Sequence, residues 1–168
     1  MGLIDFVLDA GEKLLGRGET QHALDDARLH PDDAAKMQAA NAAAADAILA
    51  YIRTHKLGAT GLTVTFDAAS ATVSLYGVAP DQPTHEKIVL CAGNVEGVAH
   101  VHDMMSVDRS EPEAQFYTVR AGDTLAHIAQ HFYGDASQYM RIYEANRPML
   151  SSPDRIHAGE TLRIPPRA

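Results

Sequence analysis

Residues 116–134, FYTVRAGDTLAHIAQHFYG, open the stretch that decides the fold of the C-terminal part of the chain. The first residues alternate between apolar and polar, and Gly122 then turns the chain before Asp123 and Thr124. Either of those two side chains can accept hydrogen bonds from the first turn of a helix, which the apolar spacing continues. The pattern predicts a strand, a turn and a capped helix that ends at Gly134.

A second helix over Gln138–Ala145 and a last strand over Thr161–Ile164 complete a β, α, α, β order. This stretch resembles the LysM domain, whose hallmark is matched by Tyr117, Val119, Gly122, Asp123, Thr124, Leu125, Ile128 and Ala129. The resemblance implies binding to polymers of N-acetylglucosamine such as peptidoglycan or chitin. The groove for such a ligand is expected between the turn at 122–124 and the loop at 151–156.

The middle of the chain predicts a helix, a hairpin, a second helix and a strand. The alanine-rich stretch Met37–His55 is expected to be helical, and residues 62–66 and 72–76 alternate as two hairpin strands. Thr84 is expected to cap the next helix, which Gly93 and Asn94 would end in the left-handed conformation.

A final strand at Ala99–Val107 gives the order α, β, β, α, β. With the sequence VEGVAHVHDMMSV, this part resembles a BON domain. The fold class predicted for the whole chain is therefore α+β, with a short N-terminal helix over Leu3–Ala10. The expected organisation is an N-terminal helical segment at 1–36 that packs on the BON domain, a BON domain at 37–107, a linker at 108–115 and a LysM domain at 116–168.

The composition narrows the classes of function. The 168 residues carry a formal net charge of -8 and no basic run, which argues against nucleic acid as a partner. The first residues interrupt their apolar run with Asp5, Asp9 and Glu12, unlike a secretory signal. No apolar stretch reaches the roughly 20 residues that cross a bilayer, so no membrane partner and a cytoplasmic location are expected.

The single cysteine, Cys91, excludes an internal disulfide and a multi-cysteine metal site. No motif of a hydrolase nucleophile or of a phosphate-binding loop is found, so the chain is predicted not to be an enzyme. Nine histidines include His127 and His131 one helical turn apart, and His100 and His102 on one strand face. Such two-residue pairs are weak signals for a transition metal, and solvated surface histidine is the preferred interpretation.

A BON domain followed by a LysM domain and preceded by MGLIDFVLDAGEKLLG resembles the small bacterial potassium-binding protein family. The alanine-rich region around Leu24–Ala47 is longer than that family leads us to expect and predicts a lengthened or added helix. The resemblance implies a K⁺ site built from backbone carbonyls where the N-terminal segment meets the BON domain. Matched by motif, these carbonyls belong to Val7, Ala10, Glu12, Gly93, Val95 and Val98.

The electrostatics of helix C-termini also favours a cation where the N-terminal segment meets the BON domain. If Leu3–Ala10 is a helix that ends at Gly11, its C-terminus and that of the helix before Gly93 would meet, each with unpartnered carbonyls and about half a negative charge. Gly11 and Gly93 would supply unusual dihedral angles, and Phe6, Val95 and Val98 would exclude water. Without the family resemblance, these residues would be interpreted as ordinary helix ends and core.

The resulting prediction is a K⁺ sensor or buffer, in which the ion orders the BON and LysM domains. The alternative is glycan binding by the LysM domain. An exposed Met149–Leu150 pair could also contact an unidentified protein partner, and the default oligomeric state is a monomer.

Overall fold

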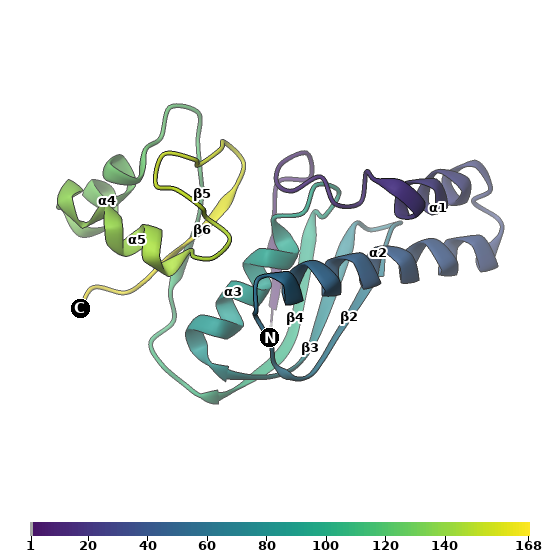
Figure 1. Ribbon diagram of the computed structural model, residues 1–168, viewed down its shortest axis with the longest axis horizontal. Helices are drawn as coiled ribbons and strands as arrows, with labels where there is room; N and C mark the ends of the chain where they lie inside the picture. Colours follow the sequence, from purple (N-terminus) through teal and green to yellow (C-terminus); the bar gives the residue numbers. More distant parts are fainter. Residues whose placement is uncertain (1) are drawn as a thin grey trace.

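Two sheets and two hydrophobic cores organise the chain in the computed structural model, which describes residues 2–168. The larger unit is built from α2 (Ala34–Thr54), β2 (Thr60–Asp67), β3 (Thr72–Asp81), α3 (Gln82–Gly93) and β4 (His100–Arg109). The smaller unit follows it and lies beside α3 (Figure 1). This arrangement confirms the α+β class and the α, β, β, α, β order of the larger unit.

The larger sheet has the strand order β1-β4-β3-β2, and α2 and α3 lie against one of its faces (Figure 1). The hairpin partners β2 and β3 are antiparallel, whereas β3 and β4 are parallel. Parallel neighbours need a crossover connection, and α3 supplies it. The core side chains of β3 and β4 include Val73, Leu75 and Val101, each with 0% of its surface exposed.

The helix predicted over Leu3–Ala10 is wrong, because residues Gly2–Asp5 form strand β1. This strand pairs antiparallel with β4, from Gly2 opposite Asp103 to Asp5 opposite His100. An isolated helix of eight residues is marginal in water, while the edge of β4 offers a row of unpaired backbone groups. Tertiary pairing therefore overrides the local helical pattern.

The first helix of the described chain is α1 (Gly18–Leu29), which packs against α2. The alanine-rich region around Leu24–Ala47 is thus divided between α1 and the first part of α2. The two are separated by a turn at Pro31, and Asp33 caps α2 by accepting hydrogen bonds from the N–H groups of Ala35 and Lys36.

Helix α3 begins differently from the prediction. Asp81, not Thr84, is its N-cap, and the carboxylate of Asp81 accepts a 2.8 Å hydrogen bond from the N–H of Thr84. Pro83 lies in the first turn, where its missing N–H costs nothing. At the other end, Asn94 has φ -82°, so the left-handed stop expected at Gly93 and Asn94 is also wrong.

The smaller unit consists of β5 (Gln115–Thr118), α4 (Leu125–Tyr133), a 3-10 turn at Ala136–Gln138, α5 (Tyr139–Ala145) and β6 (Thr161–Ile164). Thr124 caps α4, and Gly134 ends it with φ 74°, as predicted. The segment that connects the units is 110–114. Among the described residues, no helix is long and apolar enough to cross a membrane.

Candidate functional site

The structure brings together the two segments that carry the predicted ligands. The N–H of Glu12 donates to the carbonyl of Asn94 at 2.8 Å, and the N–H of Glu96 donates to the carbonyl of Glu12 at 2.9 Å. The N–H of Gly97 reaches the carbonyl of Leu8 at 2.8 Å. Residues 7–12 and 93–98 therefore form one hydrogen-bonded junction, with Glu12 and Val95 as a parallel bridge.

Two glycines permit this close approach. Gly11 has φ 101°, and a Cβ placed on it would lie 2.2 Å from the carbonyl oxygen of Asn94. Gly93 has no left-handed geometry, but a Cβ there would lie 2.1 Å from Cζ of Phe6. The expected unusual dihedral is thus found at Gly11 alone, whereas Gly93 makes room for the Phe6 ring over the end of α3.

The six predicted carbonyls differ in how many hydrogen bonds they already accept. Among the described residues, no hydrogen bond ends on the carbonyl of Ala10, Gly93 or Val98. The carbonyls of Val7 and Val95 each accept one bond, from the N–H groups of Ala10 and Val98. Because a carbonyl oxygen has two lone pairs, all of these can still bind a cation.

Glu12 is the exception. Its carbonyl accepts hydrogen bonds from the N–H groups of both Leu14 and Glu96, at 2.8 and 2.9 Å. Both lone pairs are therefore engaged. Its side-chain carboxylate is 3.7 Å from the guanidinium of Arg17 and 44% exposed.

The electrostatics of the junction come from one helix end instead of the expected two. The C-terminus of α3 leaves carbonyls without an intrahelical partner, and the aligned peptides place about half a negative charge there. The segment 6–12 contributes turn carbonyls, not a helix dipole, because it is not helical. Phe6, Val95 and Val98 are buried as expected, which keeps water from this side of the junction.

The smaller unit contacts the same junction. A Cβ on Gly159 would lie 2.7 Å from Cβ of Ala10 and 3.4 Å from a methyl group of Val7. The Asn94 side chain forms two hydrogen bonds with the backbone of Thr161, at 2.7 and 2.8 Å. Neither contact could be predicted from a sequence pattern, because the residues that meet are 67 or more positions apart along the chain.

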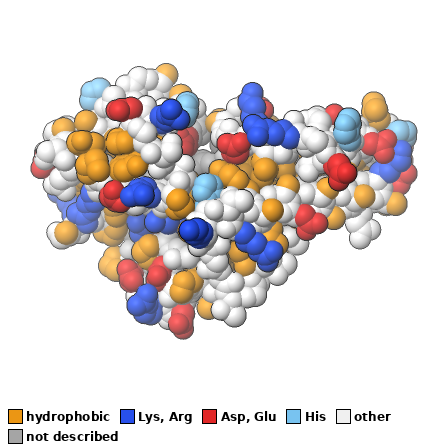
Figure 2. Space-filling view, in the orientation of Figure 1, with side chains coloured by type: hydrophobic (Ala, Val, Ile, Leu, Met, Phe, Trp, Pro, Cys, Tyr) orange, Lys and Arg blue, Asp and Glu red, His pale blue; other side chains and the backbone are white. Residues whose placement is uncertain are grey.

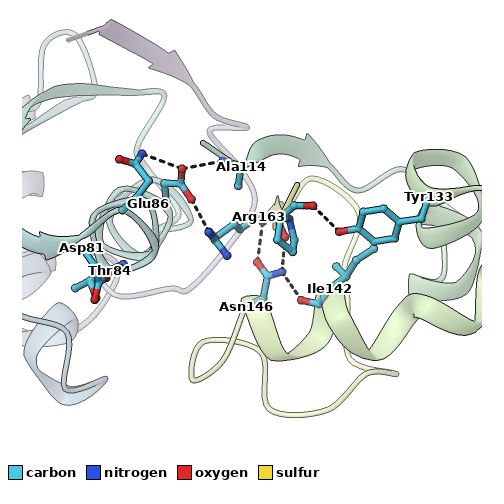
Figure 3. A network of polar contacts seen from close by, with 10 residues as sticks. Asp81, Thr84, Glu86, Ala114, Tyr133, Ile142, Asn146 and Arg163 are labelled. Carbon is cyan, nitrogen blue, oxygen red and sulfur yellow. Dashed lines mark hydrogen bonds and ion pairs between the residues drawn. The ribbon is translucent and has the colours of Figure 1, made fainter. Parts of the chain in front are cut away.

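A buried ion pair forms a second contact between the units (Figure 3). Nε of Arg163, in β6, is 2.5 Å from a carboxylate oxygen of Glu86, in α3, and both side chains are at most 7% exposed. The other carboxylate oxygen of Glu86 accepts hydrogen bonds from Gln82 and from the N–H of Ala114, both at 2.9 Å. The buried carboxylate of Glu86 is thus compensated by the guanidinium of Arg163 and by two further hydrogen bonds.

A cavity of about 360 Å³ lies next to the junction, between the two units. Glu12, Tyr51 and Asn94 line one side, and Arg155 and Glu160 line the other. Burial raises the pKa of Glu160 and that of the Tyr51 hydroxyl, and it raises the pKa of the Cys91 thiol to about 12. These shifts disfavour added negative charge on the walls of the cavity.

The LysM-like groove is also formed. A cavity of about 370 Å³ lies between the turn that includes Asp123 and Thr124 and the loop that includes Pro153 and Ile156. Asp123 itself accepts hydrogen bonds from the N–H of Arg120 and from the hydroxyl of Tyr117, and these bonds lower the pKa of its carboxyl.

Other candidates from the sequence are dispersed. His100 pairs with Asp5 at 2.8 Å, and His102, His127 and His131 are exposed. Within residues 2–168, no group of three or more His, Cys, Asp or Glu side chains is arranged to hold a metal ion. Acidic and basic side chains are interspersed over the face seen in Figure 2.

The Met149–Leu150 pair packs into the fold and does not form the exposed pair that a protein partner would need. Leu150 is 3% exposed in the core of the smaller unit, and Met149 packs against the core of the larger one. The pair therefore contributes to the contact between the two units and is not free for another protein.

Comparison with known proteins agrees with this architecture. The family model of the BON domain matches residues 40–109, and that of the LysM domain matches residues 117–165. A protein of Escherichia coli O6:H1 named "Potassium binding protein Kbp" is 38% identical over 98% of this chain and 99% of its own length. An uncharacterized protein of Deinococcus radiodurans is 49% identical over 29% of this chain and 19% of its own length.

Proposed function

Because the chain belongs to the family of the potassium binding protein Kbp, we propose that it binds K⁺ at the junction of residues 7–12 and 93–98. The ligands are the backbone carbonyls of Val7, Ala10, Glu12, Gly93, Val95 and Val98. K⁺ gives up its water to neutral carbonyl dipoles, whereas Ca²⁺ and Mg²⁺ favour carboxylates. K⁺ is the ligand of this protein, which acts as a binding protein and not as an enzyme.

The observation that carries the proposal is the state of the Gly93 and Val98 carbonyls. Both residues are buried, and neither carbonyl accepts a hydrogen bond from a described residue. More than nine in ten buried carbonyls in proteins have a partner, so two unpartnered ones in one junction require an explanation. A monovalent cation held between them satisfies both.

The Glu12 carbonyl joins the ion in this proposal by giving up one of its two hydrogen bonds. The bond to the N–H of Leu14 is local, whereas the bond to the N–H of Glu96 holds the two segments together. We expect the local bond to be exchanged, because the junction then stays closed around the ion.

Calorimetric titration of the desalted protein tests K⁺ binding directly. At constant ionic strength, we expect saturable heat with KCl and none with NaCl or MgCl₂. Equal and non-saturating heats with KCl and NaCl would contradict the proposal. A protein with a net charge of -8 attracts cations without selecting between them, and such heats would need no specific site.

A sensor or buffer in the cytoplasm is the role that we propose for this site. Carbonyl dipoles that face one another repel without a cation, so K⁺ shifts the chain toward a form in which residues 7–12, the BON domain and the LysM domain are ordered together. Slower amide exchange in all three parts with K⁺ is the expected result. Exchange that is the same in KCl and NaCl would contradict the sensor role.

The second candidate function is glycan binding, which the groove of about 370 Å³ beside Asp123 and Pro153 favours. Its ligand would be an N-acetylglucosamine oligomer. Titration with soluble chitin oligomers distinguishes the two functions, because binding there shifts the amide signals of 123–126 and 154–156 and leaves those of 93–98 in place. Unchanged spectra would exclude this alternative.

A further inference from the structure

Asn94 lies between two of the proposed ligands, Gly93 and Val95, and its backbone is held from both sides. Its N–H donates to the carbonyl of Leu90 at 2.9 Å, at the end of α3. Its own carbonyl accepts the N–H of Glu12 at 2.8 Å, from the N-terminal segment. The orientation of the peptide groups beside Asn94 is therefore set by the same contacts that form the proposed ion site.

The Asn94 side chain points in the other direction, to the LysM domain. Its Nδ2 donates to the carbonyl of Thr161 at 2.7 Å, and its Oδ1 accepts the N–H of Thr161 at 2.8 Å. A carboxamide carries a donor and an acceptor side by side, so it can pair with both main-chain groups of one strand residue. Since β5 pairs with the other edge of β6, Asn94 covers the outer edge at Thr161.

A second asparagine side chain pairs with this edge of β6 in the same way, and it belongs to the LysM domain itself. Oδ1 of Asn146 accepts the N–H of Arg163 at 2.8 Å, and its Nδ2 donates to the carbonyl of Arg163, also at 2.8 Å. The edge of β6 is thus completed by two carboxamides, one from each domain. Only the one at Thr161 depends on how the domains are docked.

The second interdomain anchor, between Glu86 and Arg163, is independent of the ion site. Glu86 precedes Asn94 by eight residues on α3, a distance of roughly 12 Å along the helix axis. Among the described residues, the side chain of Glu86 bonds to Gln82, Ala114 and Arg163, none of which belongs to 7–12 or 93–98. Among the described residues, the two hydrogen bonds between Asn94 and Thr161 are the ones that join the segment 93–98 to the LysM domain.

We infer that Asn94 is the positioning residue that couples K⁺ occupancy to the docking of the LysM domain on α3. This inference rests on the proposed K⁺ site. An ion that fixes the carbonyls of Gly93 and Val95 also fixes the backbone from which the Asn94 side chain reaches Thr161. Because coupling is reciprocal, a docked LysM domain strengthens K⁺ binding by the same factor, typically about 5- to 150-fold.

Amide hydrogen exchange on the unaltered full-length protein is the first test, because it needs no variant that must fold. The reporter is the N–H of Thr161, which donates to Asn94, and the N–H of Arg163, which donates to Asn146, is the internal reference. With KCl in place of NaCl, we expect exchange at Thr161 to slow by about fivefold or more. The change at Arg163 is expected to be smaller.

Asn94→Ala, in the full-length chain, tests the residue itself, and Glu144→Ala, which removes an ion pair with Arg147 that is 57% exposed on both sides, is the control. For Asn94→Ala we expect about tenfold weaker but saturable K⁺ binding, amide shifts that persist at 7–12, and a Thr161 signal that no longer responds to K⁺. For Glu144→Ala, which touches neither interdomain anchor, the K⁺ response of Thr161 is expected to remain.

The outcomes separate this inference from the K⁺ proposal. If the unaltered protein binds K⁺ with shifts at 93–98 but Thr161 exchanges at the same rate in both salts, the coupling through Asn94 is overturned and the ion site stands. If Asn94→Ala keeps the full affinity and the response of Thr161, the coupling is overturned as well. Absence of K⁺ binding in the unaltered protein contradicts both.

Discussion

At the scale of single residues, Gly93 has a role that differs from the one its sequence context suggests. It is not a left-handed helix stop, and it permits the ring of Phe6 to cover the end of α3. The contact joins residues 87 positions apart, so no local pattern could reveal it. Gly11, by contrast, has the positive φ that its place after an apolar run predicts, although the run before it is not a helix.

Gly93→Ala should therefore lower the free energy of unfolding by about 1–3 kcal/mol, because the new methyl group overlaps the Phe6 ring and the core must shift. K⁺ binding should weaken with it, since Phe6 no longer covers the junction. Urea unfolding and calorimetry measure the two effects. Gly58→Ala is the control, because nothing lies within 4 Å of a Cβ there; equal losses in both variants would contradict this role of Phe6.

At the scale of secondary-structure elements, the sequence predicts most helices and strands, and strand β1 is the main exception. The β, α, α, β unit and the α, β, β, α, β unit follow from hydrophobic spacing and turn residues. Strand β1 could not be predicted, because its pairing with β4 is a long-range contact that prevails over a weak local helical pattern. The six proposed ligands are inferred from the family resemblance alone. Every residue has a backbone carbonyl, so a site built from carbonyls requires no particular side chains that a sequence pattern could indicate.

Helix α3 positions half of the proposed site, so its N-cap offers a test of the element. Asp81→Ala should lower the free energy of unfolding by about 1 kcal/mol. The hydrogen bonds from Thr84 hold the pKa of Asp81 below its ordinary value of 3.8. Because the folded pKa is depressed, this stabilisation is present above pH 4 or so and is lost as the pH falls through the folded pKa.

Asp81→Asn is the matched variant, because it keeps an oxygen that can accept the N–H of Thr84 but does not titrate. Urea unfolding between pH 3 and 7 should show a smaller loss of stability on acidification for Asp81→Asn than for the unaltered protein. Identical pH profiles would mean that the cap does not contribute to the acid sensitivity.

At the scale of the whole molecule, the proposed ion site, the BON core and the LysM domain meet at one place. Gly159 packs on Ala10 and Val7, Asn94 pairs with Thr161, and Arg163 reaches Glu86 (Figure 3). The sequence predicts a linker at 108–115 but contains no pattern that indicates the contact between the two domains. The contact is made by polar and small residues, which carry no periodic signal.

Glu86→Ala should separate the domains, because it leaves the guanidinium of Arg163 buried without its charge partner, at a cost of about 3–5 kcal/mol. Small-angle scattering should report a larger radius of gyration, and amides of β6 should exchange faster. Glu144→Ala is the control, because its pair with Arg147 is 57% exposed on both sides and contributes little. An unchanged radius for Glu86→Ala would contradict the importance of this anchor.

Backbone carbonyls of two segments that are far apart in the sequence are proposed to bind K⁺ together. Amide NMR of the full-length protein, titrated with KCl and with NaCl at equal ionic strength, tests this proposal most directly. We expect saturable shifts with KCl alone, at residues 7–12 and 93–98 with one common midpoint. Shifts that are equal in both salts, or that are confined to one of the two segments, would contradict it.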